Sequence, residues 1–277
     1  MPRAARFPYW LTSWLIFCAV PALMPATAAL QAQKHILFLG ASNEFAHDSV
    51  SHAMYTIGKL GQESGLFDVR FHTDTELLTK QKLSGNKKNL DYFDALFFYT
   101  QGDIPLTDEQ KAAVMSFVRE DGKGFIAAHS GTDSFRKTWP EYIEMVGGAF
   151  LNHPWNQEFR IRVEDRDFPA TRHFPASFSI TDEIYQLNRY SRDQVRVLMS
   201  LDVGSVDMKA KNVERTDGDF ALSWVRPWGK GRVFSSVLGH RPEVWDRPDI
   251  QKMWLEAIRW VLGMSEGATD SLPKPKP

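Results

Sequence analysis

Short apolar runs and amphipathic segments alternate along the first half of the chain. Apolar runs that end in glycine or small polar residues are typical of buried strands, and apolar residues three or four apart are typical of helices. Thr107 and Gln110 form a capping box at the start of one helical segment. This half predicts strands at 35–40, 67–71, 93–99 and 125–128 and helices at 48–65 and 107–121. Because strands and helices alternate, we expect parallel strands, with the turns after residues 40, 99 and 128 on one edge of the sheet.

The second half of the chain is richer in predicted strands than in helices. Strands are predicted at 159–163, 178–180, 182–185, 195–201, 221–225 and 231–238. A short helix at 139–148 comes before them and an amphipathic helix at 250–262 follows them. The polar stretch 203–218 predicts an insertion loop, and the last two strands predict a hairpin around 227–230. The expected fold class is α/β, with a mostly parallel sheet, helices on both faces and a strand-rich C-terminal half in the same domain.

The N-terminus has the pattern of a secretory signal peptide. A basic head precedes an apolar stretch at 10–23 and small residues at 26–28. This stretch is shorter than a membrane span needs, although a retained N-terminal anchor is the alternative. We therefore expect export to the periplasm or the medium, with no membrane segment after cleavage. The predicted boundaries are a signal peptide at 1–28, an α/β domain at 34–263 and a disordered tail at 264–277.

Cysteine and charge content restrict the function. The one cysteine, Cys18, lies inside the predicted signal peptide, so the exported chain would have no disulfide, no thiolate ligand and no cysteine nucleophile. The net charge is −1 and no basic block occurs, which argues against nucleic acid or an anionic membrane as a partner. The remaining residues, about 245, are enough for the core of one domain. The oligomeric state is left open.

Histidines and carboxylates follow several of the predicted strands. Ligands of open α/β sheets bind beyond the carboxyl ends of the strands, so a polar side chain there is a candidate for chemistry. The candidate metal ligands are His47, His129, His153 and His240, and the candidate catalytic residues are His129, His240, Asp133 and Glu183. Imidazoles with carboxylates bind zinc or a similar divalent ion, and the same groups can act as general acid and base near neutral pH. The alternative is that two of the histidines are structural and only His129 and His240 line a pocket.

Other residues near these positions are candidates for substrate binding. They are His47, Gln101, Ser130, Trp155, Arg241 and Glu243. Ser130 lacks the flanking glycines of a nucleophile elbow, which argues against a serine hydrolase. Arg241 and Glu243 could bind sugar hydroxyls, or could pair with each other at the surface. Trp155 could stack on a sugar ring, or simply pack in the core.

Short motifs lie in a fixed order along the chain, at 125–133, 139–142, 146–150, 153–155, 163–165, 169–171, 182–185 and 239–245. Together they resemble the ThuA-like (trehalose-utilisation) family over roughly residues 34–263. The resemblance implies a fold like that of the class I glutamine amidotransferases, which is flavodoxin-like, and a role in bacterial sugar metabolism that includes keto-sugars. In such amidotransferases the turn after this strand carries a cysteine nucleophile, whereas here His129 stands at that place. Thiol-based glutamine hydrolysis is therefore excluded.

We therefore expect an exported enzyme of carbohydrate metabolism that acts on a disaccharide or keto-sugar, as a hydrolase, lyase or isomerase. It would use His129 and His240, with a divalent metal such as zinc, for hydrolysis or for proton transfer at a carbon beside a carbonyl. The alternative is a sugar-binding or accessory protein without turnover, because polar residues at a strand edge suit both.

Overall fold

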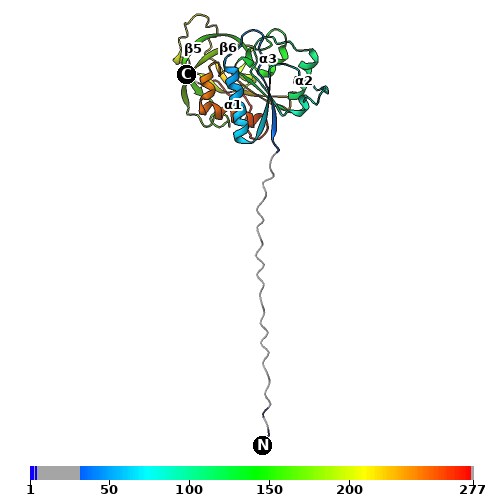
Figure 1. Cartoon of the computed structure of the whole chain (residues 1–277). Helices are drawn as coiled ribbons and strands as arrows, with labels where there is room; N and C mark the ends of the chain where they lie inside the picture. The colour runs from blue at the N-terminus through cyan, green and yellow to red at the C-terminus, as the bar shows by residue number, and fades with distance from the viewer. Residues whose placement is uncertain (3, 5–31, 276–277) are drawn as a thin grey trace. The chain divides into compact units, whose positions relative to one another are not determined.

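The computed structural model describes residues 1, 2, 4 and 32–275. The chain divides into Met1–Gln31 and Ala32–Pro277, and the fold is that of the second unit (Figure 1). The predicted signal peptide lies almost entirely outside the described residues and stays a prediction. Among the described residues, none of the helices combines the length and the apolar character that crossing a membrane requires.

A sheet of nine strands in the order β2-β1-β3-β4-β9-β8-β7-β5-β6 runs through the second unit. The strands are β1 (Lys34–Leu39), β2 (Phe67–His72), β3 (Ala95–Phe98), β4 (Gly124–Ala128), β5 (Ala149–Val163), β6 (Ser177–Asn188), β7 (Arg196–Leu201), β8 (Ala221–Trp228) and β9 (Gly231–Ser236). The α-helices are α1 (Ser49–Ser64), α2 (Asp108–Arg119), α3 (Pro140–Val146), α4 (Pro242–Asp246) and α5 (Pro248–Val261). The capping box of Thr107 and Gln110 is present at the start of α2.

Strands β2, β1, β3, β4 and β9 form a parallel half-sheet with helices on both faces. Successive residues of a strand point to opposite faces, so Phe38 packs with α1 and α5 while Leu37 packs with α2 and α3. Burial on both faces explains why β1, β3 and β4 are mainly apolar, whereas the edge strand β2 carries polar residues. The predicted helices on both faces are therefore confirmed. As expected, β1, β3 and β4 end at the same edge.

The prediction of a mostly parallel sheet is wrong. Four pairings are parallel, but β8 pairs antiparallel with β9, β7 with β8, β5 with β7 and β6 with β5. The physical reason is that no α-helix lies between consecutive strands from β5 to β9, and parallel neighbours need such a crossover. The sheet is therefore mixed, with the predicted hairpin of β8 and β9 at the junction of its two halves.

The long strands β5 and β6 were only partly predicted. The short strands predicted at 178–180 and 182–185 are one strand, β6, and β5 begins ten residues before the predicted start at 159. Register shifts between Phe150 and Trp155 break the alternation that would have marked the early part of β5. The two strands bring polar residues of the second half to the carboxyl edge of the parallel half.

The described part of the C-terminal tail, residues 264–275, contains no helix or strand. The carbonyl oxygens of Ser265 and Asp270 accept hydrogen bonds from Arg232 and Arg196 of the sheet. The predicted disorder of the tail and the predicted domain boundaries stay predictions.

Candidate functional site

The site lies at the carboxyl edge of the parallel half-sheet. His47 lies between β1 and α1, Gln101 follows β3, His129 follows β4 and His240 follows β9. Because these four strands are parallel neighbours, the segments after them start from one edge. Strand β6 of the antiparallel half contributes Glu183 to the same place.

His129 occupies a strained turn directly after β4. Its φ of 44° lies in the left-handed region that favours glycine, and its side chain is fully buried. Nδ1 donates a hydrogen bond of 2.7 Å to the carbonyl oxygen of Val237, which can only accept. The lone pair of the neutral ring is therefore on Nε2, which lies 3.0 Å from the hydroxyl of Tyr185. Burial lowers the pKa of His129 well below its usual value, so the ring is neutral at pH 7.

Three imidazole rings surround one point. The ring centroid of His47 lies 4.8 Å from that of His129, and the centroid of His240 lies 5.3 Å from each of the other two. Burial lowers the pKa of His47 to about 4, with a further contribution from His240. The neighbouring carboxylate of Glu183 raises the pKa of His240. Within the described residues, Nδ1 of His47 is buried without a hydrogen bond, whereas Nδ1 of His240 faces the carboxylate of Glu183.

Glu183 lies close to His129, His153 and His240. Its carboxylate oxygens lie 3.3 Å from Nδ1 of His240, 3.7 Å from Nε2 of His129 and 3.2 Å from Nδ1 of His153. The carboxylate is nearly inaccessible, whereas the side chain of His153 is 52% exposed. Residues two apart in a strand share a face, and Tyr185 therefore lies on the same side of β6 as Glu183.

One potential ligand atom from each of His47, His129, Glu183 and His240 falls within 4.8 Å of the others. A zinc ion bound at about 2.0–2.1 Å keeps tetrahedral ligand atoms about 3.4 Å apart. These side chains would therefore need to close by roughly 1.4 Å at most, given that spacing. Three imidazoles and one carboxylate match the donor types that zinc and similar ions prefer.

A buried carboxylate next to Glu183 holds the turn that carries His240. Asp182 accepts hydrogen bonds of 2.6 Å from the backbone N–H of Gly239 and 3.1 Å from that of Arg241. The carbonyl oxygen of Gly239 accepts hydrogen bonds from the hydroxyl of Tyr99 and the indole of Trp245. Gly239 has a φ of 114°, a conformation that side-chain-bearing residues avoid. Hydrogen bonds of the turn with Asp182, Tyr99 and Trp245 thus fix the position of His240.

Hydrogen bonds of Gln101 connect the loop after β3 with Asp133 after β4 and with Phe45 after β1. The amide of Gln101 donates a hydrogen bond of 2.9 Å to Asp133, and its oxygen accepts one of 2.6 Å from the backbone of Phe45. Arg136 lies 2.7 Å from the other oxygen of Asp133. Burial raises the pKa of Asp133 to about 6, although Gln101 and Arg136 oppose the shift.

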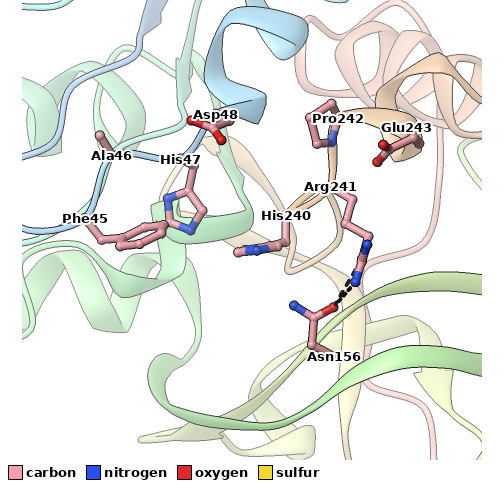
Figure 2. Close-up of a pocket in the computed structure, with 9 residues that line it drawn as sticks. All are labelled: Phe45, Ala46, His47, Asp48, Asn156, His240, Arg241, Pro242 and Glu243. Atoms are coloured by element: carbon pink, nitrogen blue, oxygen red, sulfur yellow. Dashed lines mark hydrogen bonds between the residues drawn. The ribbon is translucent and has the colours of Figure 1, made fainter.

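Two hollows flank the histidine cluster, which is formed by His47, His129 and His240. The first, with a cavity volume of about 350 Å³, is lined by Phe45, Ala46, His47, Asp48, Asn156, His240, Arg241, Pro242 and Glu243 (Figure 2). The second, with a cavity volume of about 320 Å³, is lined by Phe45, His47, Gln101, Asp133, Arg136, Phe150, His153, Glu183, Tyr185 and His240. Phe45, His47 and His240 belong to both, so the two hollows share one wall.

The structure brings most of the candidate residues together, with two exceptions. Ser130, like His129, is fully buried and lines neither hollow, but unlike His129 it is not among the four potential ligands. Trp155 packs against Phe220 and donates to the carbonyl oxygen of Asp207, which is the core-packing alternative. Arg241 bonds the side chain of Asn156 rather than Glu243. His153 lies beside Glu183 but outside the group of four potential ligands.

Sequence reasoning missed several residues of the site, among them Phe45, Tyr99, Arg136, Asn156, Asp182 and Tyr185. Only Tyr185 had a usable signal, since it follows Glu183 by two residues in a predicted strand. Phe45 and Asn156 lie in stretches whose path the sequence pattern does not predict.

Comparisons with known proteins agree with this architecture. The family model described as "ThuA: Trehalose utilisation" matches residues 35–261. A ThuA-like protein from Bacteroides uniformis is similar in structure, with a TM-score of 0.68 and 23% identity over 86% of this chain and 95% of its own. A ThuA-like protein from Parabacteroides merdae gives a TM-score of 0.63 and 16% identity over 83% of this chain and 90% of its own. A cytoplasmic protein from Salmonella typhimurium LT2 gives a TM-score of 0.55 and 11% identity over 82% of this chain and 99% of its own. No curated protein matches the sequence.

Proposed function

The chain belongs to the ThuA family of trehalose utilisation, and from this premise we propose that it is a divalent-metal enzyme acting on a carbohydrate that carries a carbonyl group. We further propose that it works after export, since its N-terminus has the pattern of a signal peptide.

One observation carries the proposal: potential ligand atoms of His47, His129, Glu183 and His240 converge within 4.8 Å of one another. They come from four separate segments of the chain, and among the described residues Nδ1 of His47 is buried without a hydrogen bond. Buried polar atoms are normally satisfied, so this nitrogen favours a missing partner at the centre of the cluster. A cation is the partner that accepts lone pairs from three rings and a carboxylate at once.

The groups around the cluster suit proton transfer beside a carbonyl. A bound divalent ion would act as a Lewis acid on the carbonyl oxygen of the substrate. Asp133 lies in the second hollow, and its pKa of about 6 makes it a base that is ionised yet still basic near neutral pH. Arg136, in the same hollow, provides a cation for substrate oxygens. Burial raises the pKa of Tyr185, so its hydroxyl stays protonated; it donates to Nε2 of His129 in this structure and would donate to a substrate oxygen once that lone pair binds the ion.

The test begins with elemental analysis of the purified protein and of two variants. We expect about one divalent ion per chain in the wild type and in His52→Ala, and a large loss in His129→Ala. His52 is a matched control because it is partly exposed on α1 and lies outside the cluster. The proteins are then incubated in D₂O with 3-keto-trehalose or trehalose, with and without a chelator, and followed by proton NMR.

The expected result is metal-dependent conversion of the keto-sugar, or deuterium uptake beside its carbonyl, that is lost in His129→Ala. Turnover that survives both the chelator and this substitution would refute a metal enzyme. Binding of either sugar without any chemical change would instead identify a sugar-binding protein.

A further inference from the structure

The histidine cluster separates two hollows of similar size, with cavity volumes of about 350 and 320 Å³. Only Phe45, His47 and His240 line both. One end of a ligand that fills a single hollow therefore contacts these shared residues. A ligand that fills both hollows passes over them. The polar residues that line only the first hollow differ in chemical character from those that line only the second.

The second hollow contains Asp133, the base of the proposed function, together with further polar side chains. Asp133, His153, Glu183 and Tyr185 line it and are absent from the first. Asp133 has a pKa of about 6, and the ring of His153 is half-exposed beside Glu183. The part of a substrate that reacts must lie in this hollow.

The first hollow contains hydrogen-bonding groups on two sides. Arg241 donates from Nε and Nη2 to the oxygen of Asn156, at 3.2 and 2.6 Å, which fixes both side chains (Figure 2). Within the described residues, this leaves the amide N–H groups of Asn156 and the carboxylate of Glu243 available as donor and acceptor. Neighbouring donors and acceptors of this kind bind the vicinal hydroxyls of a sugar ring.

Phe45 supplies an apolar surface where the two hollows meet. Phe45 is 56% exposed, and its ring lies edge-on to that of His47, with centroids 4.7 Å apart. An exposed aromatic ring at the mouth of a polar hollow can pack against the apolar face of a sugar. Two carboxylates, Asp48 and Glu243, line the first hollow beside one guanidinium, so a neutral polyol fits it better than an anion.

We infer that the first hollow is a subsite for a second, non-reacting sugar ring, and that Asn156, Arg241 and Glu243 select two-ring over one-ring substrates. This rests on the proposed function for the identity of the reacting hollow. The linkage between the two rings then lies across the wall formed by Phe45, His47 and His240.

Calorimetric binding of trehalose and of methyl α-D-glucopyranoside tests the subsite without turnover. We expect the wild type to bind the two-ring sugar at least about 10-fold more tightly, which is the effect of one or two hydrogen bonds. Asn156→Ala and Arg241→Ala should each reduce this ratio to within about 2-fold. Gln157→Ala is the matched control, because it is the next residue of β5, is exposed and points to the opposite face of the strand.

Equal affinity of the wild type for the two sugars, or an unchanged ratio in both subsite variants, overturns the inference. Neither result depends on metal content. Conversely, a protein that binds no metal but keeps the expected ratio contradicts the proposed function and supports the subsite.

Discussion

Asp182→Asn tests whether the carboxylate next to Glu183 positions His240. Asp182 accepts two backbone hydrogen bonds, from Gly239 and Arg241, and both of its oxygens are used. Asparagine keeps one oxygen but replaces the other with an amide nitrogen, which cannot accept. One buried backbone N–H therefore loses its acceptor, while the size of the side chain is unchanged.

The expected loss in stability is about 1–3 kcal/mol, the cost of one buried donor left without a partner. This is a fraction of the about 5–15 kcal/mol that a typical domain has, so the variant should fold. The turn with His240 would then be free to shift, and outer-shell changes of this kind weaken metal binding by about 10–100-fold.

Two measurements separate positioning from stability. Urea denaturation gives the free energy of unfolding, and zinc titration against a chromophoric chelator gives the affinity. Asp219→Asn is the matched control, because Asp219 is a buried carboxylate that bonds Arg192 and lines neither hollow of the site. We expect Asp219→Asn to lose stability but keep its zinc affinity. If Asp182→Asn loses stability while its zinc affinity stays within about 2-fold of the wild type, the reasoning is wrong.

Three further predictions concern the ligand, the base and the turn. Glu183→Gln removes the negative charge at similar size, so its zinc affinity should fall by more than about 10-fold; wild-type affinity would exclude this carboxylate as a ligand. Asp133 acts as a base only when ionised, so kcat/KM should fall as pH drops below about 6. In Asp133→Asn the rate should be about 100-fold or more lower and lack this acidic limb, and a retained limb would assign it to another group. Gly131→Ala would place a Cβ 2.6 Å from the backbone oxygen of Phe98, so thermal denaturation should show a loss of about 1–3 kcal/mol; an unchanged melting temperature would contradict the close approach.

The part of the site built on the parallel half could be predicted from the sequence. His47 and His129 each follow a short apolar run, and such runs become parallel strands that end at one edge. His240 was found for a different reason, since it follows the second strand of a predicted hairpin. That this strand also pairs parallel with β4 is a long-range choice that no local pattern encodes.

The antiparallel half explains what could not be predicted. Strands β5 and β6 pair along eleven positions with two register shifts, so the side of β6 that faces the cluster depends on pairing with distant residues. Asp182 and Glu183 are adjacent acidic residues of one strand, yet one holds a backbone turn and the other faces the histidines. A one-residue difference in register would exchange these roles.

The geometry of His129 separates the residues that can bind a cation from those that can move a proton. Its Nδ1 donates to the carbonyl oxygen of Val237, and the ring has no exposed surface. A second proton, on Nε2, would create a buried cation beside the hydroxyl of Tyr185, with no solvent to exchange it. His129 can therefore offer a lone pair but is poorly placed to act as the general base that its position after the strand first indicated. Under the proposed function, proton transfer would fall instead to Asp133 in the second hollow, so loss of His129 and loss of Asp133 should affect metal content and the pH profile separately.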